Sequence, residues 1–254
     1  MYIDPTHPRA ISLKIRERLV WGVKKGITST SGLIAHGRGE AFDYLVGEKT
    51  NEFAKYSIEV AAAYLIRAKY PILSINGNTA ALSADEFIKL AKLLDAKIEV
   101  NLFHYSLARV KKIEKYLKKL DADSVLESSR QPKIIIPQVA SARKVVLQEG
   151  IGNADVVFIP LEDGDRAAAL VSLGKKVITV DLNPLSRTAE CATLTIVDNI
   201  VRTMPILIKS VNNLKNSSRD KLDKIISDYN NGENLNLNLR FILNRLMKLS
   251  KASK

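Results

Sequence analysis

The sequence predicts an α/β domain built on a doubly wound, mainly parallel sheet, with a helical segment before the sheet and helices after it. Two observations support this: from residue 71 onward short apolar runs alternate with helical stretches, and nearly every run ends in polar residues. Buried strands of a parallel sheet read as continuous apolar runs. We expect one Rossmann-like domain over residues 1–254, with a mainly helical part at 1–70, parallel βα units at 71–200 and C-terminal helices at 201–254.

The composition restricts where the protein works. The chain has 254 residues, 46% of them hydrophobic, and no apolar run approaches the roughly 20 residues that cross a bilayer. It has no signal-peptide pattern, and its single cysteine, Cys191, cannot form an intramolecular disulfide. We therefore expect a soluble cytoplasmic protein with no membrane partner.

The net charge of +12 raises the question of nucleic acid as a partner. Residues 202–254 hold 11 Lys and Arg against 4 Asp and Glu, so +7 of the total lies in this C-terminal part. The basic residues there alternate with Leu and Ile at helical spacing, which is typical of solvated faces of amphipathic helices. We expect no nucleic-acid partner, although RNA binding by this basic part is an alternative.

Six apolar runs are the strand candidates, and we expect them to share one parallel sheet. They are short and separated by segments of helical periodicity. The candidates are residues 72–75, 98–103, 133–136, 156–160, 177–180 and 194–197.

Apolar residues at helical spacing predict the helices. Before the sheet we expect helices at 8–25 and 51–68, with a glycine-punctuated loop at 26–39 between them. Ser83 and Glu86 have the spacing of a capping box, which predicts that a helix begins there. Further helices are expected at 107–120, 200–214, 221–228 and 239–249, and a solvated turn at 229–232.

Polar residues follow five of the six strand candidates. These loops lie at 76–78, 101–104, 161–166, 181–188 and 198–199. In an open α/β sheet ligands bind outside the carboxyl ends of the strands, so the five loops predict a site. Asn76-Gly77 and Asp163-Gly164 are also hairpin signals, but helical patterns follow both, which leaves βα loops. A purely structural turn remains the alternative for each.

The loop that begins at Asp181 has the chemistry of a nucleotide site. Its carboxylate can accept hydrogen bonds from ribose hydroxyls, and Arg187 can pair with phosphate oxygens while Ser186 or Thr188 caps a helix. The glycine-rich phosphate-binding motifs are absent, since the nearest match, at residues 37–42, lacks its last glycine and follows no strand. A nucleophilic triad is excluded because no serine has the G-x-S-x-G context.

His36 lies beside Arg38 in the glycine-rich stretch, where backbone amides and a guanidinium can hold an anion. None of the three histidines, His7, His36 and His104, falls on an apolar helix face. The alternative for His36 is a solvated residue in a flexible connector.

Several uninterrupted motifs, in order, resemble the archaeal phosphopantothenate synthetase (4-phosphopantoate:β-alanine ligase) family. They include His7-Pro8-Arg9-Ala10, Arg16-Glu17, the stretch 32–44 (GLIAHGRGEAFDY), Ile75-Asn76-Gly77-Asn78, and residues 99–103, 160–166, 181–188 and 196–199. The similarity runs from about residue 7 to 205 and is loose at 121–150 and beyond 212.

The resemblance implies a homodimeric, ATP-dependent ligase that condenses 4-phosphopantoate with β-alanine, giving 4-phosphopantothenate, AMP and pyrophosphate for coenzyme A synthesis. The residues that it implies for ATP are Arg16, Arg38, Asp181, Leu182, Asn183, Arg187, Thr188, Asp198 and Asn199.

The roles of the other site residues are hypotheses based on the loops and motifs in which these residues lie. We expect Arg38, His36, Asp163 and Asp165 to be catalytic, with one of the two aspartates near Mg²⁺ or the β-alanine ammonium. The metal ligands themselves are not assigned. Substrate contacts are expected from Asn76, Asn101, His104 and Arg166. The alternatives are a non-catalytic nucleotide-binding regulatory protein and a dehydrogenase.

Overall fold

The computed structural model describes residues 3–120, 123–137 and 139–252. At its centre is a parallel five-stranded sheet in the order β2-β1-β5-β6-β7. The strands are β1 (Pro71–Ile75), β2 (Lys97–Val100), β5 (Val156–Phe158), β6 (Lys176–Val180) and β7 (Leu194–Ile196). The order reverses between β1 and β5, which confirms the doubly wound α/β class and opens the carboxyl edge at that point.

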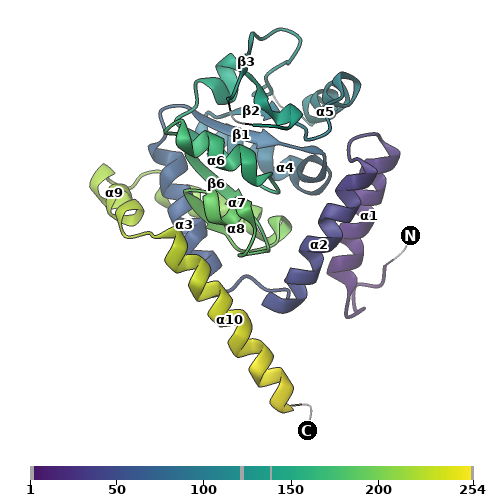
Figure 1. Ribbon diagram of the computed structural model, residues 1–254, viewed down its shortest axis with the longest axis vertical. Coiled ribbons are helices and arrows are strands. Elements are labelled where there is room, and N and C mark those ends of the chain that lie inside the picture. The colour runs from purple at the N-terminus through teal and green to yellow at the C-terminus, as the bar shows by residue number, and fades with distance from the viewer. Residues whose placement is uncertain (1–2, 121–122, 138, 253–254) are drawn as a thin grey trace.

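Helices cover both faces of the sheet (Figure 1). They are α1 (Ala10–Lys24), α2 (Thr30–Val46), α3 (Glu52–Arg67), α4 (Gly77–Leu94), α5 (Leu107–Lys119), α6 (Gly164–Ser172), α7 (Arg187–Cys191), α8 (Ile200–Leu214), α9 (Arg219–Ser227) and α10 (Asn231–Ala252). Among the described residues, no helix is both long and apolar enough to span a membrane.

Successive residues of β5 show how the two faces are covered. Phe158 belongs to the apolar cluster formed with α3, α4, α5 and α8, and its ring centroid lies 5.6 Å from that of Phe87. Val157 and Ile159 belong to the opposite cluster, which contains residues of α6. Because both faces of this strand are buried in apolar side chains, its sequence is continuously apolar, as predicted.

One predicted strand does not belong to the parallel sheet. β3 (Lys133–Ile135) pairs antiparallel with β4 (Val145–Leu147), and the two form a separate ribbon. The expectation of a sixth parallel strand was therefore wrong. The connection between these strands is too short for the crossover of a dozen or more residues that a parallel pair needs.

The predicted loop at 26–39 is mostly helix. α2 begins at Thr30, and its N-cap Ser29 accepts a hydrogen bond from the backbone N–H of Gly32. Glycine at position 32 serves close packing, because a Cβ there would lie 2.6 Å from Oδ1 of Asn78. His36 and Arg38 are consequently held on a helix and not on a flexible connector.

α4 begins earlier than its capping box predicted. Asn76 is the N-cap and accepts a hydrogen bond from the backbone N–H of Thr79, so the helix starts directly after β1. Ser83, the expected cap, lies inside the helix with non-helical dihedral angles and marks a kink. The early start brings the N-terminal end of α4 to the carboxyl edge of the sheet.

α10 also begins earlier than predicted, at Asn231 and not near residue 239. The expected turn at 229–232 is not simply solvated, because the Asn231 amide is bonded to three backbone groups. Its Oδ1 accepts from the N–H of Thr195, and its Nδ2 donates to the carbonyls of Ala189 and Ala192, at 2.8–3.1 Å. One side chain therefore fixes the start of α10 against β7 and α7.

We expect Asn231→Ala to lower the free energy of unfolding by about 2–4 kcal/mol, because it leaves several partly buried backbone groups without partners. Asn230→Ala is the matched control: its Oδ1 accepts from the N–H of Glu233, a single helix cap worth about 1 kcal/mol. Urea unfolding of both variants measures the difference. Equal losses in the two variants would contradict this role for Asn231.

Candidate functional site

A cleft of about 350 Å³ opens at the carboxyl edge of the sheet, where α2 crosses the ends of β1, β2 and β5. Five separate segments line it, and together they contribute three arginines, two asparagines and two carboxylates. The lining includes Ser29, Ser31, Gly32, Arg38, Asn76, Gly77, Asn78, Phe103, His104, Arg109, Arg143, Leu161, Glu162 and Asp163. The structure thus brings the predicted residues Arg38, Asn76, His104 and Asp163 to one cleft.

Asn76 fixes the point where the strand order reverses. Its Nδ2 donates to the carbonyl oxygens of Pro160 and Leu161 at 3.2 and 3.1 Å, which ties the end of β1 to the end of β5. Its neighbour Gly77 approaches the chain so closely that a Cβ would lie 2.4 Å from the carbonyl oxygen of Ile27. Asn76 therefore shapes the cleft, and a direct contact between its side chain and substrate stays a prediction.

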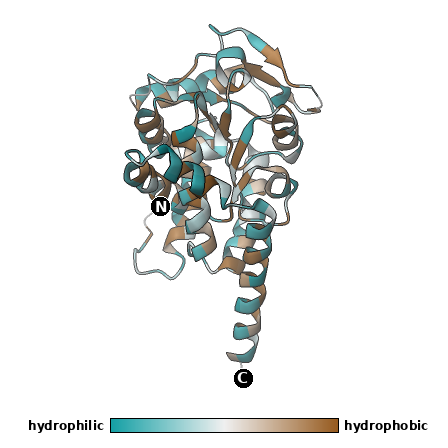
Figure 2. Cartoon of the chain, turned by 90° about the vertical axis from the view of Figure 1, so that its left-hand side faces the viewer, coloured by the Kyte–Doolittle hydropathy of each residue, from teal (hydrophilic) through white to brown (hydrophobic). Residues whose placement is uncertain are grey.

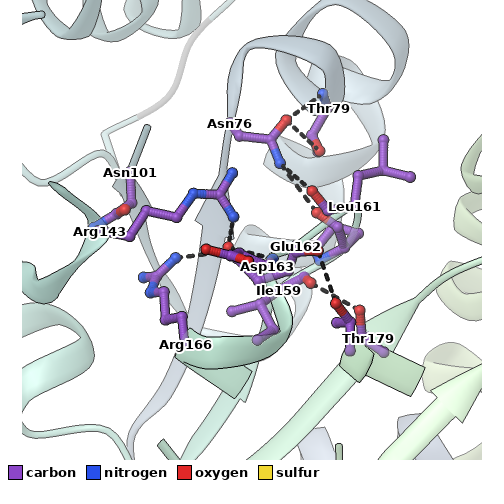
Figure 3. Close-up of polar contacts among 12 residues, drawn as sticks. Asn76, Thr79, Asn101, Arg143, Ile159, Leu161, Glu162, Asp163, Arg166 and Thr179 are labelled. Atoms are coloured by element: carbon purple, nitrogen blue, oxygen red, sulfur yellow. Dashed lines mark hydrogen bonds and ion pairs between the residues drawn. The ribbon is translucent and has the colours of Figure 1, made fainter. Parts of the chain in front are cut away.

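Glu162 is the centre of a buried charge cluster behind the cleft. Its carboxylate pairs with Arg166 at 2.7 Å and with Arg143, and Figure 3 shows both guanidinium groups directed at it. Burial lowers the pKa of Arg143 to about 9 and that of Arg166 to about 10, so both are charged at neutral pH. Arg166 is fully enclosed and meets Glu162, not the cleft; its predicted substrate contact stays a prediction.

The end of β2 contributes Asn101 and His104. Asn101 is 5% exposed, and its Nδ2 donates to the carbonyl of Val145 at 3.1 Å, which ties β2 to the β3–β4 ribbon. Its Oδ1 is buried with no partner among the described residues. His104 is exposed and lines the cleft edge-on to Phe103, with ring centroids 4.8 Å apart.

The loop after β6 is a tightly hydrogen-bonded turn. Asp181 accepts from the hydroxyl of Ser186 and from the N–H of Asn183, and Ser186 caps α7 by accepting from the N–H of Ala189. Of the two predicted caps, Ser186 is therefore the cap. Burial raises the pKa of Asp181, and the hydrogen bond from Ser186 opposes this shift.

The loops after β5 and β6 are joined directly. Thr188 donates to the carbonyl oxygen of Glu162 at 2.9 Å, and Arg187 pairs with Asp165 at 2.8 Å with its side chain 73% exposed. A Cβ on Gly164 would lie 2.5 Å from the Cβ of Arg187, so glycine is required where α6 and α7 begin. Arg187 and Asp165, two predicted site residues, thus lie together beside the start of α6.

α1 and α2 carry the other predicted residues. Arg16 pairs with Glu40 at 2.8 Å. Arg38 is exposed in the cleft, and a Cβ on the next residue, Gly39, would lie 3.8 Å from Cδ1 of Leu182, so this part of α2 lies beside the loop after β6. Burial lowers the pKa of His36 despite the nearby carboxylates of Glu40 and Asp43, so His36 is uncharged at neutral pH and can accept a proton.

Asp198 and Asn199 belong to a network that sequence reasoning only partly found. Arg202 bridges Asp198 and Asp43, while Asn199 donates to Asp43 at 2.9 Å and caps α8. Burial raises the pKa of Asp198, and the charge of Arg202 opposes this shift. The network fastens α2 to the end of β7. The spacing of four residues between Asp198, which precedes α8, and Arg202 on its first turn was a signal for it.

Leu182 is buried and packs with Val46 and Ile242, so it joins the loop after β6 to α2 and α10.

Within the described part of the chain, no group of three or more His, Cys, Asp or Glu side chains has the arrangement of a metal site. Asp163 lines the cleft, and its side chain does not cap α6. The ATP contacts expected from these loops stay predictions.

An open, doubly wound sheet with a cationic cleft at its carboxyl edge defines an α/β protein of the class that binds anionic small molecules at the strand ends. Comparison with known sequences identifies the family within this class. The chain matches the family described as phosphopantothenate/pantothenate synthetase over residues 53–245. It belongs to this family.

Curated relatives cover almost the whole chain. The 4-phosphopantoate–β-alanine ligases of Thermococcus kodakarensis and Thermococcus onnurineus are 48% and 49% identical to it, over 98% of this chain and 95% of each relative. The ligase of that name from Methanosarcina mazei is 46% identical over 92% of this chain and 91% of the relative. The predicted resemblance to the archaeal synthetase family is confirmed.

Proposed function

We propose that the chain is an ATP-dependent ligase that condenses 4-phosphopantoate with β-alanine, releasing AMP and pyrophosphate on the way to coenzyme A. Its membership of the synthetase family supports the reaction. The observation that supports the site is the position of Arg38, which lines the cleft from the part of α2 where Gly39 lies beside Leu182 of the loop after β6. A cation at this junction suits a reaction between a carboxylate in the cleft and a phosphate chain bound over the loop after β6.

The chemistry explains why the site needs cations. A carboxylate is a poor electrophile, so one of its oxygens first attacks the α-phosphorus of ATP, forming an acyl-adenylate as pyrophosphate leaves. The amine of β-alanine then attacks the acyl carbon, the amide bond forms, AMP leaves with the carboxylate oxygen, and the nitrogen loses a proton. Positioning and stabilisation of phosphate charge supply most of the catalysis in such reactions.

Several candidate residues can be assigned to individual steps of this reaction. Arg16 on α1, Arg38 on α2 and Arg187 at the start of α7 supply charge for the phosphates. His36 is not among the residues that line the cleft, and residues two apart on a helix point to different faces, so the group that takes the proton lost by the amine stays unassigned.

Mg²⁺ accompanies ATP in our proposal, with Asp163 as its protein ligand. Mg²⁺ is usually held by one or two carboxylates together with substrate phosphates, so a preformed cage of side chains is not required. The Asp163 carboxylate fits this pattern because it lines the cleft without capping α6, whereas Asp165 is paired with Arg187. The ion supplies charge neutralisation for the phosphates.

We expect purified protein with ATP, Mg²⁺ and β-alanine to release AMP only when 4-phosphopantoate is present. Arg38→Ala should lower kcat/KM by about 100-fold or more, since Arg38 contacts charge that develops in the reaction. Arg219→Ala on α9, exposed and far from the cleft, is the matched control and should retain wild-type activity. Nucleotide binding without AMP under any substrate mixture would favour a regulatory protein, and ADP would indicate an acyl-phosphate route.

Asp163→Asn is expected to raise the Mg²⁺ concentration for half-maximal activity by about tenfold, because the amide keeps the shape and removes the charged ligand. Asp220→Asn on α9 makes the same change at an exposed position and serves as control. Mg²⁺ titrations of the initial rate measure both. An unchanged Mg²⁺ dependence in Asp163→Asn would exclude Asp163 as a ligand.

We also propose that the enzyme is a homodimer in the cytoplasm and that α10 contributes to the interface between the two copies. The distal half of α10 extends away from the rest of the chain (Figure 2). Leu243, Leu246, Met247 and Leu249 on this half are 42–57% exposed. Beside it lies a hollow of about 620 Å³ between α10 and the start of α3, lined by Phe53, Phe241 and basic residues. A projecting helix with exposed apolar residues suits burial against a second copy.

Leu243→Glu combined with Leu246→Glu should convert the dimer to a monomer, because two charges would be buried in an apolar contact. Light scattering on a sizing column measures the mass. Leu173→Glu, a similar change at an exposed leucine after α6, is the control and should leave the mass unchanged. A double variant that keeps the wild-type mass would place the interface elsewhere.

A further inference from the structure

Hydrogen bonds within the protein occupy the side chains of Asp198 and Asn199, two residues that the resemblance implies for ATP. Asp198 is 1% exposed, with Oδ1 accepting from Arg202 and Oδ2 accepting from the hydroxyl of Thr50 at 2.6 Å. Asn199 is 4% exposed, donates from Nδ2 to Asp43 at 2.9 Å, and uses its Oδ1 to cap α8. Each polar atom of the two side chains thus has a partner inside the protein, which indicates a role other than direct contact with ATP.

Arg202 bridges the two carboxylates of this network. Its Nε donates to Asp198 at 2.9 Å, its Nη1 donates to Asp43 at 3.1 Å, and its Nη2 donates to both. The side chains of Arg202, Asp43 and Asp198 are 17%, 8% and 1% exposed. Burial disfavours the charged guanidinium, but the hydrogen bonds to Asp43 and the charge of Asp198 outweigh burial and raise the pKa of Arg202. Loss of this cation would leave two buried carboxylates without their partner, which is costly.

The network holds the C-terminal end of α2. Asp43 lies in the last turn of this helix, whereas Asp198 lies two residues after the end of β7. A separate contact holds the N-terminal end of α2, because Asn78 of α4 donates from Nδ2 to the carbonyl of Gly32 at 2.8 Å. α2 is therefore fixed at both ends, to α4 near its start and to the end of β7 at its last turn.

Arg38 lies on α2 between these two points. It precedes Asp43 by five residues, which corresponds to about 8 Å along the helix axis. At the next residue, Gly39, a Cβ would lie 3.8 Å from Cδ1 of Leu182, so this part of α2 lies beside the loop after β6. One helix thus couples Arg38 to the bridge that Arg202 forms, and a displacement at the bridge would move Arg38 relative to that loop.

We propose that Arg202 is a positioning residue for ATP binding. By bridging Asp43 and Asp198 it holds α2, and with it Arg38, at the distance from the loop after β6 that the phosphates of ATP require. The side chains of Asp198 and Asn199 serve this bridge and do not contact the nucleotide themselves. The inference rests on the proposed function, because it concerns the nucleotide of that reaction. A misplacement of about 1 Å caused by a mutation far from the chemistry can cost about 100-fold in rate, so a broken bridge should affect ATP and not stability alone.

The test compares Arg202→Gln and Asp43→Asn, which break the bridge from its two sides, with the control Arg67→Gln. The control removes an ion pair between α3 and α9, in which Nε of Arg67 lies 2.6 Å from Oδ1 of Asp223. Calorimetric titration with Mg²⁺-ATP in the absence of the acid measures affinity without turnover, and thermal unfolding measures stability. Each bridge variant should bind ATP at least about tenfold more weakly, while Arg67→Gln should keep the wild-type affinity. The double variant should bind within about twofold of the weaker-binding single variant, because both changes break the same bridge.

Wild-type ATP affinity in either bridge variant overturns the inference, as does an additive loss in the double variant, which would indicate that one of the two residues contacts ATP by itself. Arg202→Lys keeps the charge without the planar, bidentate geometry, so it should bind ATP with intermediate affinity. If Arg202→Gln does not fold, wild-type affinity in Arg202→Lys overturns the inference. AMP release by the wild-type protein tests the ligase function separately: ATP binding that depends on the bridge, without AMP formation, would refute that function and leave the positioning role standing.

Discussion

The structure depends on a sheet that apolar side chains cover on both faces. In β5, for example, Phe158 faces one apolar cluster, while Val157 and Ile159, the residue directly after the strand, face the other. Polar chemistry is therefore confined to the edge where the strands end, and the change of strand direction between β1 and β5 opens that edge. Asn76 holds the opening at a fixed width through its hydrogen bonds to the end of β5. The cleft follows from this topology, and it needs no glycine-rich phosphate loop.

Buried charges of both signs lie beside the cleft. An isolated guanidinium is costly to bury, so Arg166 and Arg143 are tolerated because Glu162 faces both and the carboxylate of Asp163 also acts on both. The exposed Arg38 and the half-buried Arg109 add positive charge to the cleft itself. On the other side, Arg202 with Asp43 and Asp198 fastens α2 over the end of β7. α2 thereby holds Arg38 between the two halves of the edge, where an acid and a nucleotide would meet.

Sequence reasoning found the class of fold because continuous apolar runs are a property of strands buried on both faces. It predicted a loop where α2 lies, because glycine lowers helix propensity. Tertiary packing stabilises this helix, and Gly32 makes room for Asn78. It also placed β3 in the parallel sheet, because β4 is only three residues long and gives little pattern of its own. Short strands carry too few residues for their pairing to be read from periodicity.

Among the site residues, those directly after strands could be predicted because topology places strand ends together. Asn76, His104 and Asp163 do share the cleft, and Arg38 reaches it from α2. Arg109 and Arg143 could not be found in this way, since one lies within α5 and the other within the 3-10 helix at Ala142–Lys144. No local pattern marks a surface arginine that folding turns inward. The burial of Arg166 was equally invisible: its partner Glu162 lies only four residues before it, but Arg143, the second cation on that carboxylate, is distant in the sequence.

In the proposed reaction, a carboxylate in the cleft is activated by ATP held over the neighbouring loops. The most direct test is a single turnover with 4-phosphopantoate labelled with ¹⁸O in its carboxylate, followed by mass spectrometry of the released phosphates. Attack on the α-phosphorus transfers one labelled oxygen to AMP, and this is the predicted result. Label in inorganic phosphate, or unlabelled AMP, would contradict the acyl-adenylate and the arrangement of the site that it requires.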